Sequence, residues 1–175
     1  MTLNVRNLAC YRTGRLIFAD QTFTIKAGEA VMLRGPNGSG KSTLLRALAG
    51  MLPFEGDIVL NGVELSNDID GVQEQIAFSG HLDAIKPQLT VAENLTFWAR
   101  LFAGGSIDDA VAQFSLAELW DQPAHTCSAG QKRRLGLARL VVSGRPMWLL
   151  DEPTVSLDVE TTARFADIVK THCAT

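Results

Sequence analysis

The stretch that decides the fold reads Gly35-Pro36-Asn37-Gly38-Ser39-Gly40-Lys41-Ser42, which is the pattern G-x-x-x-x-G-K-S. The apolar run 30–33 precedes it, and an apolar-periodic stretch, 43–49, follows it and ends at Gly50. This order predicts a buried strand, a loop and a helix. Such a loop turns backbone N–H groups toward phosphate oxygens, and the helix adds the positive end of its dipole. The alternative, a glycine turn that only caps a helix, does not account for the strand before it.

This phosphate loop, residues 35–42, assigns roles to its last side chains. Lys41 can reach the β- and γ-phosphates of a nucleotide, and the Ser42 hydroxyl can hold Mg²⁺. Thr43, at the start of the expected helix, completes the residues that we expect to bind nucleotide. We therefore predict a nucleotide site that runs from Gly35 to Thr43.

Composition restricts the partners of the chain. It has 175 residues, within the range of one domain, and 46% of them are hydrophobic. The formal net charge is −3, whereas a nucleic-acid binder usually carries a basic surplus, so we expect no nucleic acid. No apolar stretch approaches the roughly 20 residues that cross a bilayer. Any action at a membrane then requires another chain.

Strand and helix patterns alternate along the chain. Strands are expected at 3–9, 16–25, 56–62, 76–78 and 147–150, and helices at 90–102, 128–142 and 159–171. Thr90 and Glu93 fit a capping box, and Ser106 fits the cap of a second helix, so a helical insert is expected at about 90–122. The alternation predicts an α/β fold with a mostly parallel core sheet covered on both faces.

Two acidic residues close the last expected strand. Asp151 and Glu152 follow the apolar run 147–150. A phosphate loop needs an acidic partner on a neighbouring strand, where an Asp can hold Mg²⁺ through water and a Glu can polarise the attacking water. A plain Asp-Glu-Pro turn is the alternative reading. We predict Asp151 as a metal ligand, with Ser42, and Glu152 as the general base.

A third motif lies at Cys127-Ser128-Ala129-Gly130-Gln131. It resembles the L-S-G-G-Q signature of the ATP-binding cassette (ABC) ATPases, with Cys127 in place of Leu and Ala129 in place of the first Gly. The resemblance covers essentially the whole chain. It implies an ABC-type P-loop NTPase fold with an antiparallel β subdomain, ATP and Mg²⁺ as cofactors, and a second copy of the chain. In that family the residues corresponding to Ser128, Ala129, Gly130 and Gln131 bind the γ-phosphate held by the other subunit.

The resemblance implies further site residues. Ser156, Leu157 and Asp158 match the D-loop of the family. Tyr11 or Arg12 stands where an aromatic residue stacks on adenine, and a simple packing role for Tyr11 is the alternative. His81 stands where the family's Q-loop has Gln, so it is a candidate catalytic residue.

Several residues resemble one branch of the family, the cytochrome c maturation (haem exporter) ATPases: Cys10 near the start, His81, the 128–131 variant and the run 146–154. The resemblance implies a translocase ATPase that acts with an integral membrane subunit. It implies a peripheral place at the cytoplasmic face of the inner membrane. We expect one or two of Phe97, Trp98 and Phe102 to be exposed and to form the docking groove for that partner.

The end of the chain departs from the family pattern. A switch His is expected roughly thirty residues beyond Glu152, but the sequence stops at Thr175, and His172 is expected on a helix face. The sequence is therefore read as a single ABC domain, 1–175, truncated at its C-terminus, that binds ATP weakly and hydrolyses it poorly. The alternatives are a catalytically impaired nucleotide-binding module, an ABC transporter ATPase for another substrate, and a non-transport ABC protein.

Overall fold

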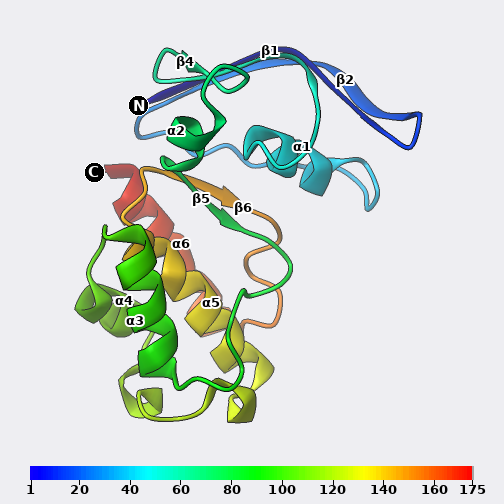
Figure 1. Cartoon of the computed structure of the whole chain (residues 1–175). Coiled ribbons are helices and arrows are strands. Elements are labelled where there is room, and N and C mark those ends of the chain that lie inside the picture. The colour runs from blue at the N-terminus through cyan, green and yellow to red at the C-terminus, as the bar shows by residue number, and fades with distance from the viewer. Residues whose placement is uncertain (175) are drawn as a thin grey trace. The chain divides into compact units, whose positions relative to one another are not determined.

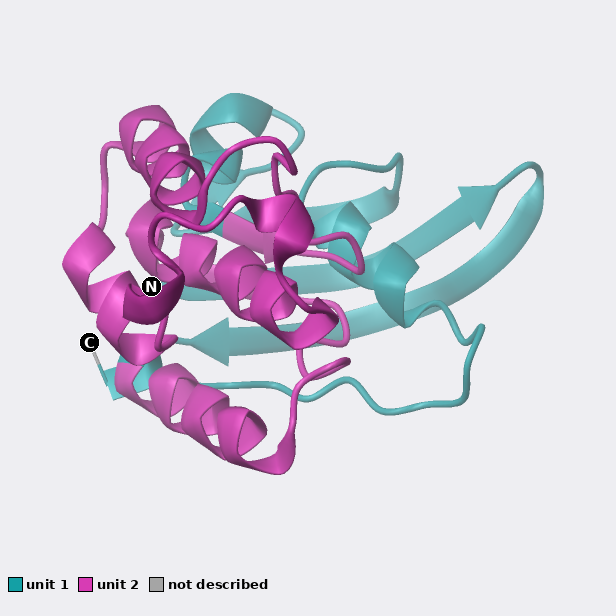
Figure 2. Cartoon of the chain, turned by 90° about the horizontal axis from the view of Figure 1, so that it is seen from below, with its two compact units in different colours: residues 1–76, 172–175 teal, residues 77–171 magenta. Residues whose placement is uncertain are grey.

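The computed structural model describes residues 1–174 and divides into two compact units (Figures 1 and 2). Unit 1 contains residues 1–76 together with the end of the chain from His172. Unit 2 contains residues 77–171. Each unit has its own secondary structure and is described in turn.

Unit 1 is built on an antiparallel sheet with strand order β2-β1-β3-β4. β1 (Thr2–Arg12) and β2 (Arg15–Lys26) form a long hairpin, and β3 (Glu55–Leu60) and β4 (Val63–Glu64) form a short one. The tight turns between them contain residues that tolerate a positive φ, such as Asn61 at 52°. The strands predicted at 3–9, 16–25 and 56–62 are confirmed as β1, β2 and β3, whereas β4 was not predicted.

Buried and more exposed side chains alternate along β1 and β3, and the buried ones form the core of unit 1. Leu3 and Val5 are 1% exposed and stand opposite Leu60 and Ile58 in the register, while the intervening Asn4 is not buried. This period of two places alternate side chains on one face of the sheet. Two helices complete the unit, α1 (Lys41–Leu48) and α2 (Ile69–Gln73), and α1 buries Leu44, Leu45, Ala47 and Leu48.

The strand expected before the phosphate loop is not formed, so this prediction was wrong. Residues 30–33 have no regular secondary structure, and Val31 and Met32 are 55% and 75% exposed. An apolar run supplies the side chains of a buried strand but not the neighbouring strand that must accept and donate its backbone hydrogen bonds. Among the described residues, no strand pairs with this run. The apolar pattern of residues 30–33 alone is therefore not sufficient to predict a strand.

Unit 2 consists mainly of helices. They are α3 (Val91–Phe102), α4 (Ile107–Gln113), α5 (Ala129–Ser143) and α6 (Val159–Ala174), with single 3₁₀ turns at Ala117–Leu119 and Ala124–Thr126. β5 (Ile76–Ser79), which starts at the boundary of the units, pairs with β6 (Met147–Leu150) in a two-stranded sheet. Within the described residues, the predicted core sheet is represented by these two strands.

Helix starts in unit 2 match the capping signals in the sequence. Thr90 and Glu93 form a capping box at α3, Ser128 and Gln131 form one at α5, and Ser106 caps α4. Helix α5 is the centre of the unit, because Leu137, Ala138 and Val142 are 0% exposed. Helices α3 and α4 pack against it, and α6 contributes Phe165 and Ile168 to the same hydrophobic cluster.

Candidate nucleotide site and its subunit elements

The phosphate loop leads into α1 in unit 1. Its residues 35–39 are exposed, and the helix begins at Lys41 with Gly40 as its cap. Gly40 offers no side chain to the first N–H groups of α1. An anion at this end of the helix would meet backbone donors and the positive end of the dipole.

Gly40 shows why the loop needs glycine. Its φ is 94°, which disfavours any residue with a Cβ, and a Cβ built there would lie 2.9 Å from Ile17 Cγ2. The Lys41 ammonium crosses the loop and donates to the carbonyls of Gly35 at 2.8 Å and Pro36 at 2.9 Å. Backbone donors, a cation and a close approach of the main chain therefore suit a polyphosphate.

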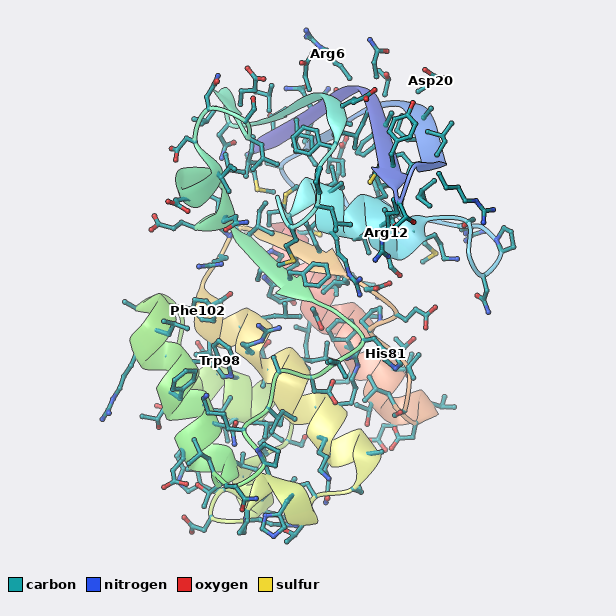
Figure 3. All side chains as sticks on the ribbon, turned by 45° about the vertical axis from the view of Figure 1, so that its right-hand side comes forward. Arg6, Arg12, Asp20, His81, Trp98 and Phe102 are labelled. Carbon is teal, nitrogen blue, oxygen red and sulfur yellow. The ribbon has the colours of Figure 1, made fainter. Side chains whose placement is uncertain are left out.

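The two candidate residues for adenine stacking lie at the far end of the β1–β2 hairpin. Tyr11 pairs with Leu16 and is 48% exposed, and Arg12, which is labelled in Figure 3, pairs with Arg15. A Cβ built on Gly40 would meet Ile17 Cγ2 at 2.9 Å and Phe18 at 3.4 Å, and both residues follow Leu16 on β2. The hairpin end and the phosphate loop are thus neighbours within unit 1, and stacking by Tyr11 or Arg12 stays a prediction.

The acidic turn, residues 151–153, belongs to unit 2. Asp151 is 6% exposed, and its backbone N–H donates to the Ser79 carbonyl at 2.8 Å, where β6 leaves the sheet. Glu152 is exposed and has a φ of 48°, a left-handed conformation that is unfavourable for a Glu. The turn therefore presents the Glu152 side chain outward while the neighbouring Asp151 stays buried.

A buried arginine that received no role in the sequence reading holds this turn. Arg133 of α5 is 4% exposed and donates to the carbonyls of Glu152 at 2.8 Å and Pro153 at 3.0 Å. It also bonds the Gly80 carbonyl and the Asp83 carboxylate, on either side of His81. His81 itself is exposed on the segment after β5 (Figure 3). In the sequence, Arg133 lies in the basic run 132–134, which gives no sign of such a role.

The signature and the D-loop lie together in unit 2. Ser128 caps α5: its Oγ accepts from the Gln131 N–H at 3.2 Å, and Gln131 Oε1 accepts from the Ser128 N–H at 2.7 Å. A Cβ on Gly130 would lie 3.1 Å from the carbonyl of Ser156. Both segments line one cavity of about 400 Å³ through Ser128, Gly130, Gln131, Ser156, Leu157 and Asp158. Ala129 begins the helix beside them.

Two ionisable groups near the signature have shifted pKa values. Hydrogen bonds from the backbone and side chain of Thr161 lower the pKa of Asp158, which accepts from the Thr161 N–H at 2.7 Å at the start of α6. Burial raises the pKa of the Cys127 thiol. Cys127 is 5% exposed and belongs to the hydrophobic cluster of unit 2, so it acts as a small apolar residue.

Helix α3 carries a row of aromatic rings. Trp98 (Figure 3) stacks on Phe102 with 5.4 Å between the ring centroids. It also meets Phe97 edge-on, with 5.0 Å between centroids. Three cations lie over the rings, namely Lys86, Arg139 and Arg145. Phe97 is 37% exposed whereas Trp98 and Phe102 are partly buried, so the prediction that one or two of the three are exposed is confirmed.

Among the described residues no helix is both long and apolar enough to cross a bilayer.

The two expected Mg²⁺ ligands are Ser42 and Asp151. Both supply oxygen, which is the donor that this cation prefers.

Comparisons with known proteins agree with these motifs. The family model described as ABC transporter matches residues 18–155. A cytochrome c biogenesis ATP-binding export protein CcmA of Ruegeria pomeroyi is 51% identical over 98% of this chain and 79% of its own length. An ABC transporter ATP-binding protein from Pyrococcus furiosus superimposes with a TM-score of 0.87 at 25% identity, over 99% of this chain and 86% of that one.

A dimeric ATP-binding cassette in a post-hydrolysis state, bound to ADP and Pi, has a TM-score of 0.84 at 24% identity, over 98% of this chain and 82% of that one. The fold is that of the ABC ATPases, as predicted. The chain belongs to the ABC transporter family, in the branch of the cytochrome c biogenesis ATP-binding export proteins.

Proposed function

We propose that this chain is the ATP-binding and hydrolysing subunit of an ABC transport complex for cytochrome c biogenesis. One observation carries the proposal: a phosphate loop at an uncapped helix start and a signature beside a D-loop occur in one chain that is 51% identical to a CcmA protein. The first element suits the phosphates of ATP. The second suits a nucleotide held by another subunit.

Residues of unit 1 bind the phosphates and the base of the nucleotide in this proposal. The N–H groups at the start of α1 and the Lys41 ammonium neutralise phosphate charge, and Tyr11 or Arg12 stacks on the base. The carbonyls of Gly35 and Pro36, which Lys41 now bonds, give way to phosphate oxygens as its acceptors. Ser42 and Asp151 would hold Mg²⁺, which supplies charge neutralisation at the β- and γ-phosphates.

Hydrolysis falls to the acidic turn and to a second copy of the chain. The exposed Glu152 carboxylate accepts a proton from the attacking water as general base. The exposed His81, at the position of the family's Q-loop Gln, is the second candidate catalytic residue. The second copy contributes the N-terminal end of its α5, with Ser128 and Gly130, to the γ-phosphate. The dimeric cassette bound to ADP and Pi supports this arrangement.

The partner in this proposal is an integral membrane subunit, with the chain bound to the cytoplasmic face of the inner membrane. Exposed apolar side chains on unit 2 support a docking surface, which we define as Leu82, Phe97 and Leu101, with exposed fractions of 82%, 37% and 60%. Arg139 and Arg145 lie over the rings of Trp98 and Phe102, and Lys86 lies 4.3 Å from the centroid of the Phe97 ring, so cations border this apolar surface.

Substitution of the general base tests the proposal. Glu152→Gln keeps the size and polarity of the side chain but removes its basicity, so ATP should bind with the affinity of the wild type while turnover falls by roughly 100-fold or more. Equilibrium ATP binding and steady-state phosphate release measure the two effects. Turnover that persists in Glu152→Gln would remove Glu152 from this role.

Docking is tested separately. The double variant Phe97→Ser and Leu101→Ser should weaken association with the membrane subunit in a pull-down from detergent, with little change in thermal unfolding. Val63→Ser on β4 is the matched control, since Val63 is also 37% exposed but lies in unit 1. Equal loss of binding in the control, or no loss in the double variant, would contradict this docking surface.

A further inference from the structure

All five N–H bonds of the Arg133 guanidinium have an acceptor. The side chain is 5% exposed and lies inside unit 2. Its acceptors, with the donor–acceptor distances, are Pro153 O at 3.0 Å, Gly80 O at 3.1 Å, Asp83 Oδ1 at 2.8 Å, Glu152 O at 2.8 Å and Asp151 O at 3.5 Å. The last of these is the longest and weakest. A planar guanidinium is the only side chain with five donors, so no other residue could satisfy this set.

The five acceptors belong to two short segments. Three are the successive carbonyls of the acidic turn, and they fix the backbone on both sides of the Glu152 side chain. The other two flank His81, at Gly80 and Asp83. One cation therefore joins the two segments that carry the candidate catalytic side chains. We call Arg133 with these five acceptors the arginine clamp.

The backbone conformation of the turn explains why it needs such support. Glu152 has a φ of 48°, which costs energy for a residue with a Cβ and persists only where the surroundings fix it. The Glu152 carbonyl receives one of the two shortest bonds of the clamp. Charge balance comes from the Asp83 carboxylate, whose side chain is 25% exposed.

Packing along α5 holds the Asp83 end of the clamp. Gly136 lies one helical turn after Arg133, and a Cβ built on it would stand 2.7 Å from Asp83 Cβ. The helix backbone and the 80–83 segment are thus in direct contact. Because Ser128 caps α5, Arg133 stands on the same helix that carries the signature at its start.

We propose that Arg133 is a positioning residue for hydrolysis, which fixes the acidic turn and the His81 segment in the arrangement that the reaction needs. The inference rests on the proposed role of Glu152 as general base. The proposal predicts that a change at Arg133 affects the rate of hydrolysis and not the binding of nucleotide. Loss of the clamp should leave the phosphate contacts of Lys41 and the loop amides unchanged, because Arg133 bonds none of these residues, and should slow the chemical step.

Arg133→Lys in the full protein tests this, because Lys keeps the charge but has three donors on a flexible stem instead of five in a fixed fork. We expect the kcat for ATP to fall roughly 10- to 100-fold while KM stays within about twofold. Hydrogen exchange measured by mass spectrometry should become faster in peptides covering 80–86 and 151–157, with no change over α3. Val142→Ala, a buried site on the same helix that takes no part in the clamp, controls for simple destabilisation.

The outcomes separate the two proposals. If Glu152→Gln turns over ATP as fast as the wild type, the proposed function fails. If Glu152→Gln is inactive but Arg133→Lys has the kcat and the exchange pattern of the wild type, only the clamp is overturned, and an equal kcat loss in Val142→Ala per folded molecule also overturns it.

Should Arg133→Lys fail to fold, Asp83→Asn decides the question. This variant removes the charge of one acceptor and keeps its carbonyl oxygen. A smaller fall in kcat with faster exchange at 80–86 supports the clamp, and wild-type kcat and exchange contradict it.

Discussion

The phosphate loop and the acidic turn use opposite means to hold a reactive group in place. In the loop, the Lys41 ammonium bonds carbonyls five and six residues away, and glycines set the backbone. In the acidic turn, the backbone around Glu152 is held by Arg133, which is 19 residues away in sequence and buried. The loop thus depends on contiguous residues and the turn on tertiary packing. Mutations in the packing of unit 2 should therefore affect the turn and spare the loop.

The largest effect should come from the helix that supports the turn. Leu137→Ala removes a side chain of α5 that is 0% exposed, which should lower the free energy of unfolding by about 2–5 kcal/mol. Chemical denaturation measures this loss. Native-state hydrogen exchange should then accelerate in peptides of α5 and residues 151–157. Equal acceleration in the β1–β2 hairpin would break the comparison, because it would show that the two regions unfold together.

The next effect tests the loop. Lys41→Ala removes a cation that would make charge-assisted bonds to phosphate, each worth about 1.5–3 kcal/mol, so ATP affinity should fall roughly 10- to 100-fold. The melting temperature should hardly move, since the bonds of Lys41 are to exposed carbonyls of the loop itself. Isothermal calorimetry with ATP and thermal unfolding separate the two quantities. A large loss of stability would show that the loop also has a structural role.

Prediction of secondary structure from the sequence succeeded where the contacts that determine an element are local. The strands of the first hairpin, the capping box at Thr90 and the cap at Ser106 follow from short patterns, and the structure confirms them. It failed at 30–33, because a strand also requires a neighbour that supplies hydrogen bonds.

The same distinction explains the missed arginine. Arg133 stands in a basic run that reads as a solvated helix face, and only the folded chain brings Gly80 and Asp83, 53 and 50 residues earlier, against it. Spacing carries no signal for contacts of this kind. The motifs located the reacting side chains, whereas the means by which they are positioned required the tertiary structure.

A smaller effect is expected at the start of α5. Ser128→Ala removes the hydroxyl that accepts from the Gln131 N–H, which should cost about 1 kcal/mol of stability. Ser128→Thr keeps a hydroxyl at the cap and should recover most of it. Thermal unfolding of both variants measures the difference. If Ser128→Ala matches the wild type in stability, the capping box does not stabilise the helix that supports the acidic turn.

The smallest effect concerns pH and the start of α6. The bonds from Thr161 lower the pKa of Asp158 below its usual value of 3.8, so the folded state binds this proton less readily than the unfolded state. The stabilisation is therefore fully present above pH 3.8 and is lost as the pH falls through the lower pKa of the folded state. Asp158→Asn should melt slightly below the wild type at pH 7, and this difference should shrink as the pH falls below 3.8 and vanish below the pKa of the folded state. Asp158 lies at the surface beside the signature. If the difference in melting temperature persists at low pH, the local bonds from Thr161 do not account for it. The D-loop would then be held by tertiary packing, like the acidic turn, and not by local bonds, like the phosphate loop.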